Sequence, residues 1–232
     1  MRLSIIIPAY NEEDNIREVI EKIEFSLGIP HELVVVNDHS VDRTAEIISG
    51  LCAKYKNIKL VHNNRQRGFA NALRTGFESA STELLVPVMG DLCDDLSTIR
   101  KMLSKADEGY DIICGCRYIK GGSRLGGSKV KGFFSSFVGW TLHYLLWIPT
   151  HDVANAFKMY RKKVIDGIDI QAKGFEISME IALKGYYAGF RITEVPTVWR
   201  ERTKGKSSFK MLRLFPDYFK LYLWGILKAL SR

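Results

Sequence analysis

The sequence predicts an α/β fold with an open, mostly parallel β-sheet flanked by helices. Three short apolar runs, at Ser4–Ile7, Leu33–Val36 and Leu84–Met89, each end in a polar loop that carries acidic side chains. Helix-like segments separate the runs, and this alternation favours right-handed crossovers and parallel strands. Ligands of such sheets bind outside the carboxyl ends of the strands, so we expect the three loops to meet at one site.

The spacing of apolar residues and the start and stop signals predict the remaining elements. Helices are expected at Asn15–Leu27, Asp42–Tyr55, Phe69–Ala80, Leu96–Ala106, Phe133–Ile148 and Glu176–Lys184, and further strands at Ile58–His62, Asp111–Cys116, Phe157–Tyr160 and Arg191–Val195. Gly28 should stop the first helix. Pro216 can start the last one, because the N–H that proline lacks would go unpaired in a first turn. The basic, glycine-containing segments Lys120–Lys131 and Arg200–Lys210 are expected to be loops.

The charge of the chain is divided unevenly between its halves. The 232 residues are 46% hydrophobic and 26% charged, which excludes a disordered chain and fits one domain. Residues 1–116 hold 13 Lys and Arg against 18 Asp and Glu, a balance of −5, whereas residues 117–232 hold 21 against 8, a balance of +13. The basic half should meet an anionic partner, such as phosphates, a membrane surface or nucleic acid. Four cysteines without zinc spacing are expected to be reduced thiols in the cytoplasm.

Two segments of the basic half are rich in aromatic and apolar residues. These are Phe133–Ile148 and Leu214–Leu230, and neither reaches the roughly 18–20 uncharged apolar residues that span a bilayer. They are either core helices or helices at a membrane interface, where Trp, Tyr and Lys are favoured. We therefore divide the chain into a domain at 1–210 and a C-terminal amphipathic helix at 211–232, which is a candidate for membrane attachment.

The first two acid-bearing loops are candidates for nucleotide binding. Pro8–Glu13 could place polar groups under a base and a ribose, and Asp38 could accept a hydrogen bond from a base N–H or a sugar hydroxyl. The alternative is local structure: a strand-to-helix turn with acids at the helix start, and a capping residue for the helix at Asp42–Tyr55.

The third loop is a candidate metal site. Asp91, Asp94 and Asp95 follow the Leu84–Met89 strand, and carboxylates suit Mg²⁺ or Mn²⁺, which proteins usually hold with one or two carboxylates plus substrate phosphates. Such a metal would neutralise charge on a departing diphosphate. The alternative is a capped loop that leads into the next helix.

The basic loops offer partners for an anionic acceptor. Arg117, Lys131, Arg202 and Lys206 could hold a phosphate by forked and point-charge contacts, although any one of them could equally be a solvated surface charge.

Five motifs, in order along the chain, resemble those of one enzyme family. They are Ile6-Ile7-Pro8-Ala9-Tyr10-Asn11-Glu12-Glu13, Val35-Val36-Asn37-Asp38-His39-Ser40, the Asp91 loop, Gly115-Cys116-Arg117-Tyr118, and Glu194-Val195-Pro196 with Arg202 and Gly205-Lys206-Ser207. This pattern is similar to that of family 2 glycosyltransferases with the GT-A fold, a Rossmann-like sheet. Within the family it looks most like the dolichyl-phosphate mannose synthase group, which glycosylates polyprenyl phosphates.

The resemblance implies roles for individual residues. Pro8, Ala9, Tyr10, Glu12, Asp38 and Asp91 would hold the nucleotide, and Asp91 with Asp94 would hold Mg²⁺ or Mn²⁺. Arg117, Lys131, Arg202 and Ser207 would surround the acceptor phosphate, and Asp91, Arg117 and Arg202 would be catalytic. Asp152 falls where the family has an Asp before Ser-Gly-Phe.

The chain departs from the family pattern at several positions. Met89 replaces the first Asp of the Asp-x-Asp metal motif, Cys93 replaces a Gln, Asn155-Ala156 replaces Ser-Gly, and Ser208 replaces a Lys. These changes bear on metal use, on the sugar and on the acceptor more than on the reaction class.

The function that follows is an inverting transfer of a mannose- or glucose-like sugar from a GDP- or UDP-linked donor to a polyprenyl phosphate. A phosphate oxygen is already anionic, so its attack needs no strong base. We expect peripheral attachment at the cytoplasmic face of a membrane, and the sequence leaves open a membrane-spanning protein partner.

Two alternatives remain. One is transfer to a saccharide or protein hydroxyl, with Glu176 or Glu180 as the base. The other is a non-enzymatic membrane- or RNA-binding module, which would leave the acidic loops without a role, so nucleic acid is not the expected partner. A Rossmann dehydrogenase is disfavoured because no Gly-x-Gly-x-x-Gly follows the first strand.

Overall fold

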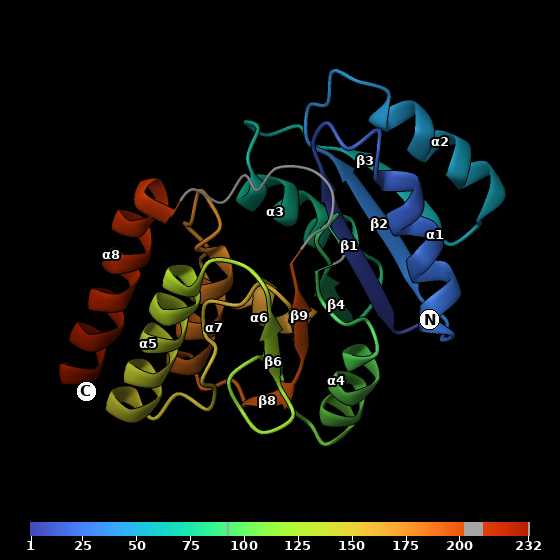
Figure 1. The fold of residues 1–232 in the computed structure, drawn as a ribbon. Helices are drawn as coiled ribbons and strands as arrows, with labels where there is room; N and C mark the ends of the chain where they lie inside the picture. Colours follow the sequence, from blue (N-terminus) through green and yellow to red (C-terminus); the bar gives the residue numbers. More distant parts are fainter. Residues whose placement is uncertain (92, 202–210, 232) are drawn as a thin grey trace.

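In the computed structural model, residues 1–91, 93–201 and 211–231 are described, with the backbone alone at 211–213, and they form a sheet with helices on both faces (Figure 1). Within these residues the main sheet has seven strands in the order β3-β2-β1-β4-β7-β5-β8. Only β7 runs antiparallel to its neighbours, so the sheet is mostly parallel, as predicted. The strands are β1 (Leu3–Ala9), β2 (Glu32–Asn37), β3 (Ile58–His62), β4 (Leu84–Pro87), β5 (Ile112–Cys116), β7 (Lys158–Arg161) and β8 (Ile192–Pro196).

The helices cover both faces of this sheet. They are α1 (Ile16–Leu27), α2 (Thr44–Lys54), α3 (Phe69–Ser79), α4 (Thr98–Asp107), α5 (Lys129–Leu146), α6 (Lys162–Asp166), α7 (Ile177–Tyr187) and α8 (Met211–Leu230). Apolar side chains of α1, α2 and α4 share one core with one face of the sheet, and those of α3, α6 and α7 share a second core with the other face. The short strands β6 (Ser123–Leu125) and β9 (Val198–Arg200) pair in parallel apart from the main sheet.

Alternation along β1 explains why both faces of the sheet are buried. Ile5 and Ile7 point into the first core, whereas Ile6 points into the second. The sequence of β1 is therefore a nearly continuous apolar run, as expected for a strand covered on both sides. On the second face α3 lies close to β1, because a Cβ at Gly76 would come within 2.3 Å of the side chain of Ile6.

A third core lies outside α7 and joins the two apolar segments of the basic half. Leu142 and Leu146 of α5 pack against Met179 and Leu183 of α7, and Tyr222 lies among the α8 side chains packed on them. Figure 1 shows α5, α7 and α8 side by side, at the opposite end of the molecule from α2. One side of both segments is thus core, and the other sides remain at the surface.

Two expectations about the second half are wrong. The final helix begins at Met211, so Pro216 lies within it rather than at its start. Contacts of α8 with α5 and α7 offset the one hydrogen bond that this proline cannot donate. The segment Lys120–Lys131 is not simply a loop, since it contains β6 and the first residues of α5. The sequence also missed β9 and α6, which are too short to show a periodic pattern.

Candidate active site

The three acid-bearing loops meet at one edge of the sheet, as expected. The N–H of Asp38 donates to the carbonyl of Ala9 at 2.8 Å, so the end of β2 lies beside the end of β1. On the other side of β1, a Cβ at Gly90 would lie 3.9 Å from the Glu12 carboxyl carbon. The loop after β4 is therefore next to the loop after β1, and the two expected nucleotide loops are next to the Asp91 loop.

The first loop offers an exposed ring backed by a cation. Tyr10 is 41% exposed, its hydroxyl accepts a hydrogen bond from Arg67 at 2.7 Å, and the guanidinium carbon of Arg67 lies 4.7 Å from the ring centre. Pro8 is half-buried and Ala9 buried, so they form the floor of this loop. Glu12 is held in place through its N–H, which donates to Thr44 Oγ1 at 2.8 Å. A ring on a rigid turn is a surface on which a nucleobase can stack.

Asp38 is buried and is used by the protein itself. Its Oδ1 accepts a hydrogen bond from Asn63 Nδ2 at 2.6 Å, and its Oδ2 accepts one from the N–H of Gly68 at 3.0 Å. The carboxylate therefore fixes the 63–68 turn that carries Arg67 next to Tyr10. The capping alternative is not what the structure shows, because α2 begins at Thr44 after Arg43, and Asp42 rather than Asp38 accepts a hydrogen bond from the N–H of Thr44, at 3.0 Å.

The carboxylates after β4 have three different surroundings. Asp91 Oδ1 accepts from the N–H of Cys93 at 3.2 Å, and Asp95 Oδ1 accepts from the N–H of Ser97 at 3.0 Å, just before α4. Asp94 Oδ1 is buried and has no hydrogen-bond partner among the described residues. Burial raises the pKa of Asp94 to about 7; attraction to Arg117 opposes this rise, and repulsion by Asp91 and Asp152 adds to it.

The pair Asp91 and Asp94 fits part of a divalent metal site. Among the described residues no group of three or more His, Cys, Asp or Glu side chains is arranged to hold a metal. Magnesium, however, needs only one or two carboxylates when substrate phosphates complete its shell. The unpartnered Oδ1 of Asp94, close enough to Asp91 to repel it, is an oxygen that a cation would satisfy.

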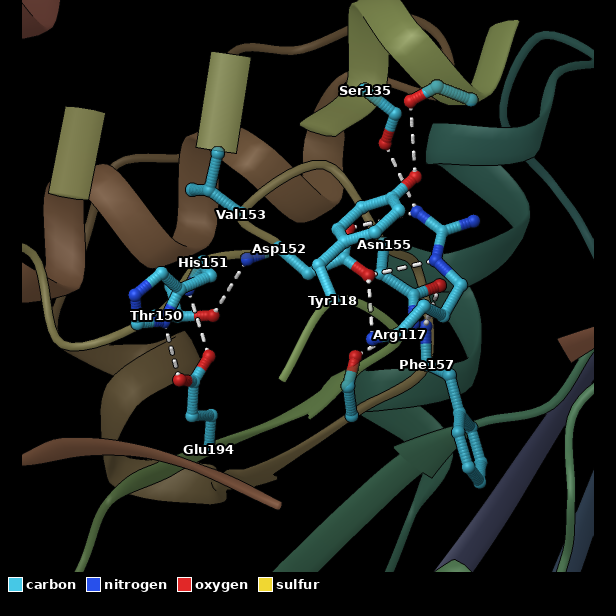
Figure 2. A network of polar contacts seen from close by, with 12 residues as sticks. Arg117, Tyr118, Ser135, Thr150, His151, Asp152, Val153, Asn155, Phe157 and Glu194 are labelled. Carbon is cyan, nitrogen blue, oxygen red and sulfur yellow. Dashed lines mark hydrogen bonds and ion pairs between the residues drawn. The ribbon is translucent and has the colours of Figure 1, made fainter. Parts of the chain in front are cut away.

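Arg117 follows β5 and forms a buried ion pair with Asp152 (Figure 2). Its Nε and Nη2 donate to the two carboxylate oxygens at 2.7 and 2.8 Å, and its backbone N–H donates to Oδ2 at 3.1 Å. The arginine side chain is 12% exposed and the aspartate is fully buried. Burial works against the charge of Arg117, but the attraction and hydrogen bonds of Asp152 outweigh it, so the pKa of Arg117 is raised.

Helix α5 reaches this ion pair through its first two turns. Arg117 Nη2 donates to Ser135 Oγ at 3.0 Å, and the Tyr118 hydroxyl donates to the Gly132 carbonyl (Figure 2). Lys131 lies four residues before Ser135 and so shares its face of the helix. The structure thus places two of the expected phosphate ligands, Arg117 and Lys131, around the start of one helix.

The remaining candidates are of two kinds: residues outside the described part of the chain, and the two glutamates considered as bases. Arg202, Lys206 and Ser207 lie outside the described residues. Glu180 accepts hydrogen bonds from Gln171 and Ala172 and pairs with Lys184 at 2.7 Å. Glu176 Oε1 accepts from the N–H groups of Lys173 and Gly174, while its buried Oε2 has no partner among the described residues.

Sequence reasoning missed the partners that hold these side chains. Ser135 carries no motif, although its spacing from Lys131 on a helix could have drawn attention to it. Arg67 belongs to none of the five motifs, and its contact with Tyr10 joins residues 57 positions apart. Asp152 was noticed only through the family resemblance, and its contact with Arg117 depends on packing between segments 35 residues apart.

Two curated relatives are similar along nearly the whole chain. One is a dolichol-phosphate mannosyltransferase of Pyrococcus furiosus, 33% identical over 96% of this chain and 63% of that protein. The other is a polyprenol monophosphomannose synthase of Mycolicibacterium smegmatis, 28% identical over all of this chain and 89% of that protein. The chain thus spans less than two thirds of the length of the Pyrococcus relative.

Solved structures share the fold. S. aureus TarS, solved in complex with UDP-GlcNAc, has a TM-score of 0.70 at 20% identity and covers 98% of this chain and 67% of its own. Glucosyl-3-phosphoglycerate synthase from Mycobacterium tuberculosis, in complex with UDP, has a TM-score of 0.72 at 14% identity over 97% of this chain and 80% of its own. The family model for glycosyl transferase family 2 matches residues 4–168. With five ordered motifs, this fold and that match together, the chain belongs to glycosyl transferase family 2.

Proposed function

We propose that this protein is an inverting glycosyltransferase that moves a mannose- or glucose-like sugar from a GDP- or UDP-linked donor to a polyprenyl phosphate. The observation that carries the proposal is the buried Arg117, whose guanidinium contacts Ser135 of α5, a helix with an aromatic outer face. A guanidinium beside an apolar surface suits an acceptor that has an anionic head and a hydrocarbon chain. The names of the two curated relatives support the same class.

The contacts of Glu180 on α7 support a phosphate rather than a hydroxyl as the acceptor. A hydroxyl acceptor needs a base within hydrogen-bond reach. Glu180 is tied to backbone N–H groups and to Lys184, so it is not available. A phosphate oxygen attacks the anomeric carbon as an anion and needs no such base.

The residues of the first half would hold the donor. Tyr10 with Pro8 and Ala9 provides a surface for the base, and Asp38 fixes the turn that brings Arg67 beside it. Asp91 and Asp94 would hold Mg²⁺ or Mn²⁺, which neutralises charge on the leaving diphosphate. Manganese is present with UDP in one structure of the Mycobacterium tuberculosis synthase, which covers 99% of this chain with a TM-score of 0.67.

We further propose that the protein attaches peripherally to the cytoplasmic face of a membrane through α5 and α8. Large apolar side chains are exposed on both helices: Phe133, Phe134, Phe137, Trp140, Tyr144 and Leu145 on α5, and Phe215, Phe219, Leu223, Leu227 and Leu230 on α8. Such helices bury apolar faces at the headgroup boundary while cations meet anionic lipids. In the described part of the chain, no helix is long and apolar enough to cross a membrane.

The proposal is tested by measuring sugar transfer in detergent or liposomes, with Mg²⁺ and Mn²⁺ and with GDP- and UDP-sugars. The acceptors are a polyprenyl phosphate and the matching free polyprenol. We expect product from the phosphate alone. Product from the free alcohol, or from a saccharide but not from the lipid phosphate, would overturn the acceptor assignment.

A second candidate is transfer to a hydroxyl with Glu176 as the base. The observation in its favour is that Glu176 Oε2 is buried without a partner among the described residues. The variant Glu176→Gln decides between the two. If the acceptor is a lipid phosphate, this variant should keep nearly full activity. If the acceptor is a hydroxyl and Glu176 is the base, it should lose activity.

A further inference from the structure

Lys158 of β7 is a buried cation that the proposed chemistry does not use. Its side chain is fully buried. Among the described residues its Nζ meets no carboxylate in an ion pair and donates instead to the carbonyl oxygens of Val153, at 2.9 Å, and of Asn155. Burial lowers the pKa of Lys158, with Cys114 and Asp152 opposing the shift. An amine can donate both hydrogen bonds in either protonation state, so these contacts do not depend on its charge.

A buried lysine is costly, and an apolar side chain of similar length would fill the same space at lower cost. The role of Lys158 must therefore lie in the two carbonyl groups to which it donates. Both belong to the turn between Asp152 and Phe157, which Figure 2 shows beside Arg117. This turn has no helix or strand to supply hydrogen bonds for its carbonyl groups.

The turn is attached to the end of β5 at three points. Arg117 donates to the Asp152 carboxylate, Asn155 Nδ2 donates to the Gly115 carbonyl at 2.7 Å, and the N–H of Gly115 donates to the Phe157 carbonyl at 3.0 Å. The fit is close, because a Cβ at Gly115 would lie 3.0 Å from the Phe157 oxygen. A shift of the turn would therefore move Asp152, and with it the guanidinium of Arg117.

We propose that Lys158 is a positioning residue: by binding the carbonyl groups of Val153 and Asn155 it fixes the turn that presents Asp152 to Arg117, and so sets the direction of the Arg117 guanidinium. That this guanidinium faces a phosphate rests on the proposed function. The fixed geometry of the turn is independent of the proposed function.

The first test needs no substrate and uses a thiol next to Arg117. Cys116 is fully buried, and burial raises its pKa, so the native thiol is protonated and protected from alkylation. In Lys158→Met, we expect Cys116 to react with iodoacetamide about tenfold faster than in the wild type, because the turn opens locally. Mass spectrometry of the Cys116 peptide measures the rate, and the half-buried Cys52 is the internal reference.

The matched control is Met159→Ala, the next residue of β7. Met159 is also fully buried but lies in the core on the first face of the sheet, so its loss lowers stability without removing a hydrogen bond to Val153 or Asn155. Equal Cys116 rates in Lys158→Met and Met159→Ala would overturn the proposal. Should Lys158→Met not fold, Lys158→Gln serves in its place: it is too short to reach both carbonyl groups, and the same rise is expected.

The second test asks whether Lys158 acts through Arg117. On a lipid phosphate acceptor, Lys158→Met should lower kcat by roughly 10- to 100-fold, the size of effect that a misplaced catalytic group produces. In an Arg117→Lys background the same change should lower kcat no further, whereas effects that multiply would overturn the proposal. If the wild type transfers no sugar, the proposed function fails, and the Cys116 rates still decide the role of Lys158.

Discussion

The two halves of the candidate site hold their buried carboxylates in different ways. In the first half, Asp38 is bound by neutral donors, the amide of Asn63 and the N–H of Gly68. In the second half, Asp152 is bound by the guanidinium of Arg117. A carboxylate with neutral partners can be replaced by an amide at small cost, but an ion pair that loses one charge leaves the other one buried.

The difference matches the division of charge along the chain. The slightly acidic first half contributes the Asp91 and Asp94 pair. The strongly basic second half contributes Lys131 at the start of α5 and Arg117, which contacts that helix. The first half therefore offers oxygen ligands for a cation, and the second offers donors for an anion. We expect substitutions in the two halves to fail in different ways, and four experiments test this.

The largest effect is expected for Asp91→Ala. If Asp91 holds the metal that neutralises the leaving diphosphate, turnover should fall by roughly 10²-fold or more with the fold intact. Steady-state kinetics and circular dichroism measure the two quantities. Asp95→Ala is the control, because Asp95 accepts from the N–H of Ser97 before α4 and should tolerate the change. Normal turnover in Asp91→Ala would show that Asp91 does not hold a metal on which turnover depends.

The second experiment compares Asp152→Asn with Asp38→Asn. The first strands the buried charge of Arg117 and should lower the free energy of unfolding by about 3 kcal/mol. The second keeps an acceptor oxygen for the neutral donors and should cost about 1 kcal/mol. Urea denaturation of both variants measures the difference. Equal losses would show that the two carboxylates are held alike and that our comparison is wrong.

The third experiment concerns the aromatic surface beside Arg117. The double variant Phe133→Asp/Phe137→Asp places two charges on the exposed face of α5 and should weaken binding to anionic liposomes by at least about tenfold. Phe25→Asp on α1 is the control, since Phe25 is 90% exposed and lies in the first half. Sedimentation with vesicles at low salt measures binding. A similar loss in both variants would mean that α5 is not the docking surface.

The last experiment concerns a pH dependence at Asp94. Because burial raises its pKa to about 7 in the folded protein, folding takes up a proton between the ordinary pKa of an aspartate and pH 7. The wild type should therefore lose stability relative to Asp94→Asn as the pH rises through this window, with no further change above it. Urea denaturation in the presence of a chelator at several pH values checks this. A gap that is constant with pH would show that Asp94 is charged throughout.

The sequence predicted the first half of the fold closely, because its signals are local. The spacing of Ile16, Val19, Ile20 and Ile23 and the stop at Gly28 match α1, whose last residue is followed by that glycine at a φ of 57°. The loops after β1, β2 and β4 were expected at one edge because the strands are parallel. That reasoning needs only the order of the elements and no detail of packing.

The second half was predicted less well, because its structure depends on contacts between distant segments. The four residues of β7 read as a strand, but nothing in them shows that their neighbours are β4 and β5 or that their direction is reversed. Pro216 looked like a helix start because the packing of α8 on α7 is absent from the local pattern. For the same reason the roles of Asp152 and Ser135 could be read only from the folded chain.

The position of β7 also bears on how the chain folds. The first five strands of the sequence cannot form a continuous sheet alone, because β4 and β5 are joined only through β7, which comes more than forty residues after β5. During synthesis both strands would emerge with an unpaired edge and wait for residues 158–161 to leave the ribosome. Insertion of β7 would then join β4 to β5 and bring Asp152 to Arg117, and β8 would pair with the other edge of β5. Such late, non-local pairing is slow, and a chain cut before residue 158 should be prone to aggregation.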